Sequence, residues 1–252
     1  MIIIKTEEEI LKMKKAGEIL ANVHKEIAKM IKPGITTMEI DTFVEKYLEE
    51  RGAYPEQRGY QGYPYAICAS VNDEICHGFP RKSPIVDGDI VTIDMVVNYD
   101  GWLADSAWSY GVGNLSETAS KLLDVTKKSL YIGIEKAVIG NRIGDISHAI
   151  QEYVESQGFS VVRDFVGHGI GKSMHEDPQV PHYGNPGRGI RLTEGMVITI
   201  EPMVNVGTFR LKVDDNEWTA RTLDGKLSAQ YEHTLAITKD GPLIITDQGK
   251  DR

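Results

Sequence analysis

Apolar residues recur every three or four positions over residues 6–31 and again over residues 36–52, which predicts two amphipathic helices. Each segment opens on a threonine with a glutamate three residues further on, and this spacing is typical of a capping box. The two predicted boxes pair Thr6 with Glu9 and Thr36 with Glu39. Short apolar segments separated by turn residues follow as far as Tyr110, and they predict strands.

The same order of elements returns in the second part of the chain. Residues 116–139 and 145–157 predict two more helices, because each has helical periodicity and ends at a glycine. Strands are expected from residue 159 to about residue 246. The order helix, helix, strands therefore occurs twice.

The residues themselves also repeat between the two parts. Segment 87–94 aligns with segment 194–201, so that Asp94 matches Glu201. Residues 76–78 align with residues 167–169, so that His77 matches His168. These matches in the same order predict a single α+β domain, residues 1–252, with pseudo-symmetric halves of about 1–112 and 113–252.

Residues 87–110 predict a β-hairpin with its turn at Asn-Tyr-Asp-Gly. Asp94 lies in the first apolar strand and Asp105 in the second. If the turn pairs residue 98 with 101, the two aspartates are directly opposite; if it pairs 99 with 102, they are diagonal neighbours on one face. The hairpin alone fits either two solvated aspartates at a sheet edge or a divalent metal site.

The repeat favours the metal site. Glu201 is the counterpart of Asp94, and Glu232 lies in a late apolar strand as Asp105 does in the first half. If the halves pack about a pseudo-two-fold axis, these four acids meet at the centre together with His77 and His168. Two divalent cations would neutralise four carboxylates, and a bridging hydroxide could lie between them. Oxygen ligands with one imidazole favour manganese, iron or cobalt over a structural zinc.

Composition and charge narrow the classes of function. The chain has 252 residues, of which 41% are apolar and 26% charged, and its net charge of −9 argues against stable nucleic-acid binding. The apolar run before Lys5 is too short for a signal peptide, and no apolar segment has the length needed to span a membrane. Two cysteines, Cys68 and Cys76, fit a reduced, cytoplasmic protein.

An ordered set of motifs covering nearly the whole chain resembles the type I methionine aminopeptidases, in their short bacterial form. The motifs are Cys76-His77-Gly78, Thr92-Ile93-Asp94, Asp105, Gly167-His168-Gly169-Ile170-Gly171, Met174-His175-Glu176, Glu201-Pro202-Met203-Val204 and Tyr231-Glu232-His233-Thr234. The resemblance implies a pita-bread fold, in which the two halves surround a central antiparallel sheet. It also implies a hydrolase that removes the N-terminal methionine of nascent proteins when the next residue is small.

The resemblance assigns a role to each matching residue. Asp94 would bind one metal ion and His168 the other, while Asp105 and Glu232 bridge both ions. Glu201 would bind the metal ion that carries His168 and also transfer protons to and from a metal-bridging hydroxide. His77 and His175 would contact the substrate or the tetrahedral intermediate. The partners implied are N-terminal peptides of nascent chains and a transient contact with the ribosome, and a monomer is expected.

The family's side-chain pocket falls on the residues Tyr60, Tyr63, Cys68, His77, Met174 and Trp218. Gln57 stands where some members have cysteine, and Met174 where many have phenylalanine. Asn72 and Ser228 match positions near a monovalent-cation site in some members, although hydrogen bonding within a turn explains such residues equally well.

Other interpretations remain open from the sequence alone. The cysteines fit small buried residues, and the aromatic pocket residues fit ordinary packing. His24 and His148 are expected on helix surfaces, and no role is predicted for His182 or His233. A proline-specific peptidase of the same fold and a non-catalytic binding protein are the two competing classes. The first usually carries an added N-terminal domain, and the second need not keep the five ligands.

Overall fold

The computed structural model describes residues 1–249. Its four long helices are α1 (Glu7–Met30), α2 (Thr37–Glu49), α3 (Glu117–Lys136) and α4 (Ile143–Ser156). Both predicted capping boxes are present, because Thr6 and Thr36 each accept a hydrogen bond from the backbone of a glutamate whose side chain accepts one in return. Helix α3 ends before the predicted residue 139, because Ala137 already leaves the helical conformation.

Fifteen short strands and one 3-10 turn, η1 (Tyr60–Gly62), complete the described chain. The strands are β1 (Ala53–Pro55), β2 (Cys68–Val71), β3 (Glu74–Cys76), β4 (Ile90–Tyr99), β5 (Trp102–Gly111), β6 (Ser160–Val161), β7 (Gly167–Gly169), β8 (Glu176–Val180), β9 (Val197–Ile200), β10 (Met203–Asn205), β11 (Leu211–Val213), β12 (Ala220–Thr222), β13 (Ser228–Gln230), β14 (His233–Thr238) and β15 (Gly241–Ile244). They form four antiparallel sheets of three to five strands.

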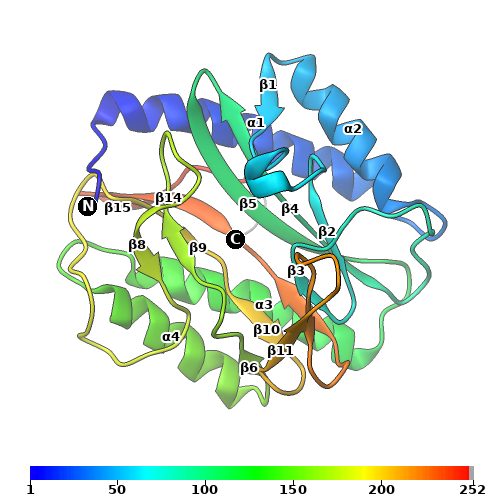
Figure 1. The fold of residues 1–252 in the computed structure, drawn as a ribbon. Helices are drawn as coiled ribbons and strands as arrows, with labels where there is room; N and C mark the ends of the chain where they lie inside the picture. Colours follow the sequence, from blue (N-terminus) through cyan, green and yellow to red (C-terminus); the bar gives the residue numbers. More distant parts are fainter. Residues whose placement is uncertain (250–252) are drawn as a thin grey trace.

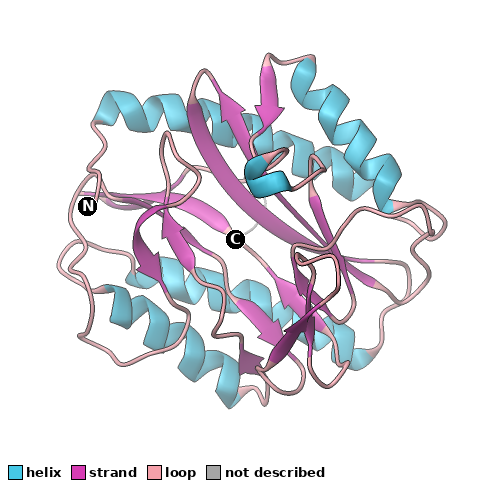
Figure 2. Cartoon of the chain, viewed as in Figure 1, coloured by secondary structure: helices cyan, strands magenta, loops and turns pink. Residues whose placement is uncertain are grey.

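The strands lie between two pairs of helices (Figures 1 and 2). Helices α1 and α2 cover one side, and α3 and α4 cover the other. One large apolar core contains residues from all four helices and from the strands between them. None of the helices in the described part has both the length and the apolar character that crossing a membrane requires.

The long hairpin β4–β5 pairs Tyr99 with Trp102. Asp94 therefore lies opposite Ala107, and Asp105 lies opposite Val96. The two aspartates are diagonal neighbours on one face of the hairpin, so the second of the two predicted registers is the correct one. Side chains that alternate along each strand then point both carboxylates towards the second half of the chain.

Strand β5 is joined to the region of β14 by hydrogen bonds along the centre of the molecule. The backbone N–H of Glu232 donates to the carbonyl of Ala107 at 2.8 Å, and the Ser106 hydroxyl donates to the carbonyl of Glu232 at 2.9 Å. The Asp105 N–H donates to Thr234 Oγ1 at 3.0 Å. These bonds hold Asp105 of the first half close to Glu232 of the second half.

The prediction that His24 lies on a helix surface was wrong. Its side chain is fully buried between α1 and β5, and its Nδ1 lies 2.8 Å from the hydroxyl of Tyr110. Burial lowers the pKa of His24 to about 4, so this imidazole is neutral in the folded protein at neutral pH.

Candidate metal centre and substrate cavity

One cavity of about 280 Å³ lies where the two halves of the chain meet. All the metal-binding, catalytic and pocket residues predicted from the sequence line it. These residues are Asp94, Asp105, His168, Glu201, Glu232, His77, His175, Tyr60, Tyr63, Cys68, Met174 and Trp218. The structure thus brings together side chains from both halves, as the internal repeat predicts.

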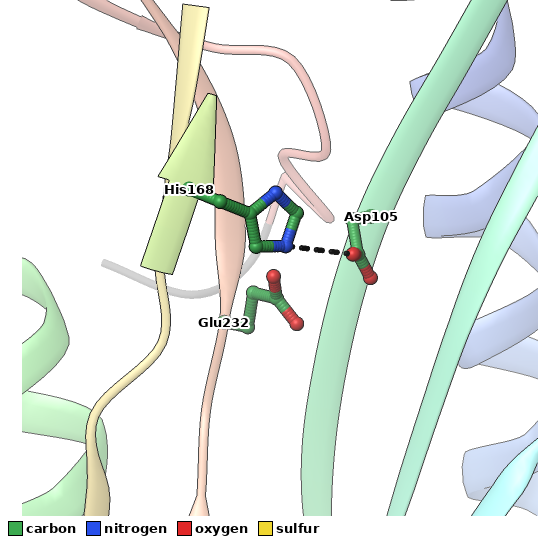
Figure 3. Close-up of side chains that lie close together, drawn as sticks. All are labelled: Asp105, His168 and Glu232. Carbon is green, nitrogen blue, oxygen red and sulfur yellow. Dashed lines mark ion pairs between the residues drawn. The ribbon is translucent and has the colours of Figure 1, made fainter. Parts of the chain in front are cut away.

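Asp105, His168 and Glu232 form the tightest cluster of candidate ligands, with ligand atoms all within 4.8 Å of one another. Figure 3 shows the His168 imidazole directed towards the Asp105 carboxylate, with the Glu232 carboxylate beside both. His168 Nε2 lies 3.6 Å from Asp105 Oδ2 and 3.6 Å from Glu201 Oε1. All three residues of the cluster are buried.

Glu201 is held at the end of β9 by three neighbours. Its carboxylate accepts a hydrogen bond from Thr199 Oγ1 at 2.8 Å and a longer one from Gln230 Nε2 at 3.4 Å. Its backbone N–H donates to His182 Nε2 at 3.0 Å. Asp94 completes the acid cluster from β4, the strand that pairs with β5.

The four acids are crowded together in a buried part of the molecule. Burial is the main cause that raises the pKa of Asp94 to about 7 and that of Glu201 to about 8, and repulsion from Asp94 adds to the shift of Glu201. Burial and then neighbouring carboxylates raise the pKa values of Asp105 and Glu232 well above the ordinary range. Burial lowers the pKa of His168 to about 4, which leaves its imidazole neutral and free to bind a metal ion.

This cluster fits divalent cations. Asp105 Oδ1 and Glu232 Oε1 are buried and have no hydrogen-bond partner among the described residues. Buried carboxylates without a donor are costly unless a cation lies against them. Four carboxylates and one neutral imidazole form an oxygen-rich donor set of the kind that manganese, iron or cobalt binds.

Two further histidines face the acid cluster. The His175 ring lies 4.5 Å from the His168 ring between centroids, and its Nδ1 is 2.9 Å from the Tyr60 hydroxyl. The His77 ring packs edge-on against Phe165 at 5.3 Å. Burial lowers the pKa of both histidines, to about 4 for His77. Neutral imidazoles at these positions can donate a hydrogen bond from one nitrogen to a substrate oxygen.

Aromatic and apolar side chains also line the cavity. Tyr63 and Trp218 meet edge-on, with ring centroids 5.1 Å apart. The Tyr63 hydroxyl donates to the carbonyl groups of Ile67 and Gly78, so its ring is fixed in place. Burial raises the pKa of the Cys68 thiol well above its usual value, which supports a small apolar residue rather than a nucleophile.

The two departures from the family's pocket have different surroundings. Gln57 lines the cavity, but its amide bonds the backbone of β4 on either side of Met95: Nε2 donates to Asp94 O at 3.2 Å, and Oε1 accepts from Val96 N at 2.7 Å. Gln57 therefore fixes the strand that carries Asp94. Met174 lines the cavity directly.

Sequence reasoning missed several residues of the site. Phe165 and Gln230 line the cavity, and His182 and Thr199 hold Glu201. Gln230 and Thr199 carried a usable signal, because they lie two residues before Glu232 and Glu201 and strand periodicity places such residues on one face. His182 supports Glu201 through the backbone, which no motif reveals.

The predicted monovalent-cation residues lie next to each other away from this cavity. Ser228 N donates to Asn72 O at 2.9 Å. The Asn72 amide donates to Asp89 and accepts from Ile90 N, as the alternative explanation by turn hydrogen bonding expects.

Residues 11–239 match the model of metallopeptidase family M24. The methionine aminopeptidase of Clostridium perfringens is 52% identical over 246 residues, which cover 98% of this chain and 99% of the relative. The solved structure of the methionine aminopeptidase from Rickettsia prowazekii superposes with a TM-score of 0.97 at 41% identity, covering 98% of this chain and all of the other. That from Thermotoga maritima gives a TM-score of 0.96 at 46% identity, again covering 98% and 100%.

The fold and the acidic cavity thus define a metallopeptidase with the pita-bread fold. Within family M24, the chain belongs to the type I methionine aminopeptidases, which are hydrolases. The fold class and the enzyme class predicted from the sequence are both confirmed.

Proposed function

We propose that this enzyme removes the N-terminal methionine from peptides whose second residue is small, with two divalent cations held by Asp94, Asp105, His168, Glu201 and Glu232. One observation supports this most strongly: buried carboxylate oxygens from both halves of the chain, which have no hydrogen-bond partner among residues 1–249, line one cavity together with aromatic side chains. A single cation would leave several negative charges buried and uncompensated. Manganese, iron and cobalt are the metals proposed, since the donors are mostly oxygen.

The bound cations would supply a hydroxide nucleophile that bridges them and would polarise the scissile carbonyl. The protein's own residues then act on protons and orientation. Glu201, anchored by Thr199 and Gln230, takes a proton from the attacking water and returns one to the leaving amine. Its anchors keep the carboxylate in one orientation, so that one group can serve both steps.

His77 and His175 are proposed to bind the substrate around the scissile amide. The Tyr60 hydroxyl contacts Nδ1 of His175 and limits rotation of the imidazole ring. The other ring nitrogen, Nε2, is therefore held in one direction. A neutral His175 can donate to the carbonyl oxygen as negative charge develops on it. His77, packed against Phe165 and Trp218, is proposed to bind the substrate between the acids and the aromatic pocket.

Methionine fits the aromatic end of the cavity. Thioether sulfur makes favourable contacts with the edges of rings, and Tyr60, Tyr63 and Trp218 offer such edges together with Met174 and Cys68. Norleucine loses the sulfur contact, and leucine carries a branch in place of the unbranched, flexible thioether chain. The residue after methionine would lie close to His175 and the cations, which favours a small side chain.

The wider setting is also proposed. The chain acts as one peptidase domain of two halves, about 1–112 and 113–252, as a monomer in the cytoplasm. Its substrates are the N-termini of nascent proteins, met through transient contact with the ribosome. A monovalent cation near Asn72 and Ser228 stays a prediction. It is supported by the buried Ser228 hydroxyl, which has no hydrogen-bond partner among residues 1–249.

The test is a set of peptides of equal length with manganese present: Met-Ala-Ser, Met-Gly-Ser, Met-Leu-Ser, Leu-Ala-Ser, Lys-Ala-Ser and Ala-Pro-Ser. We expect fast release of methionine from the first two peptides and slow release from Met-Leu-Ser. The last three should be poor substrates. Comparable kcat/KM on Leu-Ala-Ser would remove the methionine preference, and preference for Ala-Pro-Ser would favour a proline-specific peptidase.

A further inference from the structure

Lys5 and Glu176 form an ion pair that is almost completely buried. Only 2% of the Lys5 side chain and 6% of the Glu176 side chain are exposed. The ammonium group donates to the Glu176 carboxylate and to the carbonyl of Ile3. Burial of two charges is costly, and such a pair is weak evidence for stability by itself. The role of this ion pair must therefore be inferred from the residues that lie next to it.

Glu176 is the first residue of β8 and directly follows His175. The loop from β7 to β8 carries Met174 and His175, both of which line the substrate cavity. The loop starts after Gly169, the last residue of β7, and the Leu103 N–H donates to Gly171 O at 2.9 Å. The bond from Lys5 holds the loop at its other end, one residue from the His175 imidazole.

Lys5 is itself held by the turn that precedes β9. Its N–H donates to Gly195 O at 2.8 Å. A Cβ on Gly195 would lie 2.7 Å from Lys5 O, so the N-terminal segment packs directly on this turn. Strand β9 leads to Glu201. Lys5 thus connects the strand before one proposed proton-transfer group with the loop that carries His175.

Gly171 in this loop packs directly against the pair. A Cβ on Gly171 would lie 2.6 Å from Lys5 Cε and 2.7 Å from Glu176 Oε1. The loop backbone is therefore in contact with both charged side chains. A displacement of either charge would move this loop, since a packed interior has no free volume to absorb the change.

We propose that Lys5 is a positioning residue for the peptidase reaction: its ammonium group fixes Glu176 and thereby the loop that directs His175 at the scissile carbonyl. The inference rests on the role of His175 in the proposed function. Lys5 itself does not touch the substrate. It acts through loop geometry, and a small misplacement of a group that stabilises the transition state reduces turnover more than it reduces binding.

The experiment is a double-mutant cycle on manganese-loaded full-length enzyme. Lys5→Met is made in the wild type and in His175→Ala, and kcat and KM are measured for methionine release from Met-Ala-Ser. In the wild-type background, we expect kcat to fall about tenfold or more, with KM and bound manganese nearly unchanged. In the His175→Ala background, the same substitution should change kcat by less than about twofold, because the group that it positions is gone.

Two further variants sharpen this result. Lys12→Met makes the same substitution at a half-exposed lysine paired with Glu8 on α1, and it should leave kcat unchanged. Glu176→Gln removes the other charge of the pair at nearly the same size and should reduce kcat as Lys5→Met does. If Lys5→Met does not fold, Lys5→Met combined with Glu176→Gln removes both charges together and should show the same loss of kcat.

The positioning role would be overturned if Lys5→Met reduced kcat by the same factor in both backgrounds, or if a folded Lys5→Met enzyme had normal kcat. Either result would leave the proposed methionine release by the wild type unaffected. A wild type that releases no methionine, or normal turnover in His175→Ala, overturns the inference together with the proposed function. The two cases are distinguishable, because failure of the proposed function is seen in the wild type and in His175→Ala, before Lys5 is changed.

Discussion

Removing the cations from the acid cluster should make the free energy of unfolding fall as the pH rises. In the metal-free protein, burial raises the pKa of Glu201 to about 8, whereas an unfolded glutamate titrates near its ordinary value of 4.5. Between these values the native state binds a proton that the unfolded state has lost. Stability from a raised pKa is present at low pH and is lost as the pH rises through the native value.

From pH 6.5 to 8.5 the four acids with raised pKa values dominate, because the histidines finish losing their protons in the unfolded state near the lower limit. Below it, buried neutral histidines act in the opposite direction: burial lowers the pKa of His24 to about 4, so stability rises with pH up to the ordinary value of 6.5. Above this range, the buried thiol of Cys68 begins to contribute, because burial raises its pKa well above the ordinary value of 9.0.

The size of the effect follows from the Glu201 pKa of about 8. At about 1.4 kcal/mol per pH unit of unmatched proton binding, Glu201 alone loses on the order of 2 kcal/mol between pH 6.5 and 8.5. In a protein of this size, that corresponds to a fall in Tm of roughly 4–8 °C. Asp105 and Glu232, whose pKa values are also raised, add to the same direction.

The assay is thermal unfolding of chelator-treated, dialysed protein at several pH values across this range, with and without manganese. Metal-free Glu201→Gln is the matched control and should show a smaller fall in Tm. Manganese-loaded protein should show no fall, because the cations keep the carboxylates ionised in the native state. A metal-free Tm that is constant or rises from pH 6.5 to 8.5 would refute the view that these acids are crowded and unpaired.

Two further predictions concern turnover. Glu201→Gln keeps the shape but cannot accept a proton, so kcat on Met-Ala-Ser should fall roughly 10²–10⁴-fold; near-normal kcat would remove Glu201 from proton transfer. His175→Ala should reduce kcat on the order of 10²-fold or more with bound metal unchanged, as the loss of an oxyanion donor does. Loss of metal measured in this variant would instead make His175 a ligand or a structural residue.

The sequence predicts the acid cluster because a carboxylate inside an apolar strand is unusual and because both halves carry one. Asp94 and Glu201 end up in one cavity with Asp105 and Glu232, as the repeat implies. The hairpin register could not be chosen from the sequence, because both pairings keep the two aspartates on one face. The structure selects it by pairing Tyr99 with Trp102.

His24 shows where periodicity was read incompletely. It lies at helical spacing between Leu20 and Ile27, both fully buried, so the pattern already placed it on the buried face. A buried polar side chain requires a hydrogen-bond partner, and the Tyr110 hydroxyl on β5 is that partner. That partner lies far along the chain, so no local pattern could name it.

The contacts that support the site could not be predicted either, because their partners lie far apart in the sequence. The buried pair of Lys5 and Glu176 joins residues that only the folded chain brings together. The bond from Glu201 N to His182 depends on the backbone and not on a residue type that a motif could specify. The sequence thus predicts the groups that carry the chemistry better than those that orient them.

The central claim is that the buried acids bind divalent cations that the peptidase reaction needs. The direct measurement is methionine release from Met-Ala-Ser by thoroughly metal-free enzyme to which manganese, iron(II) or cobalt(II) is added in known amounts. We predict no release without metal and a rise in rate that reaches its maximum by two equivalents per chain. Full activity in protein shown to contain no metal would contradict the account.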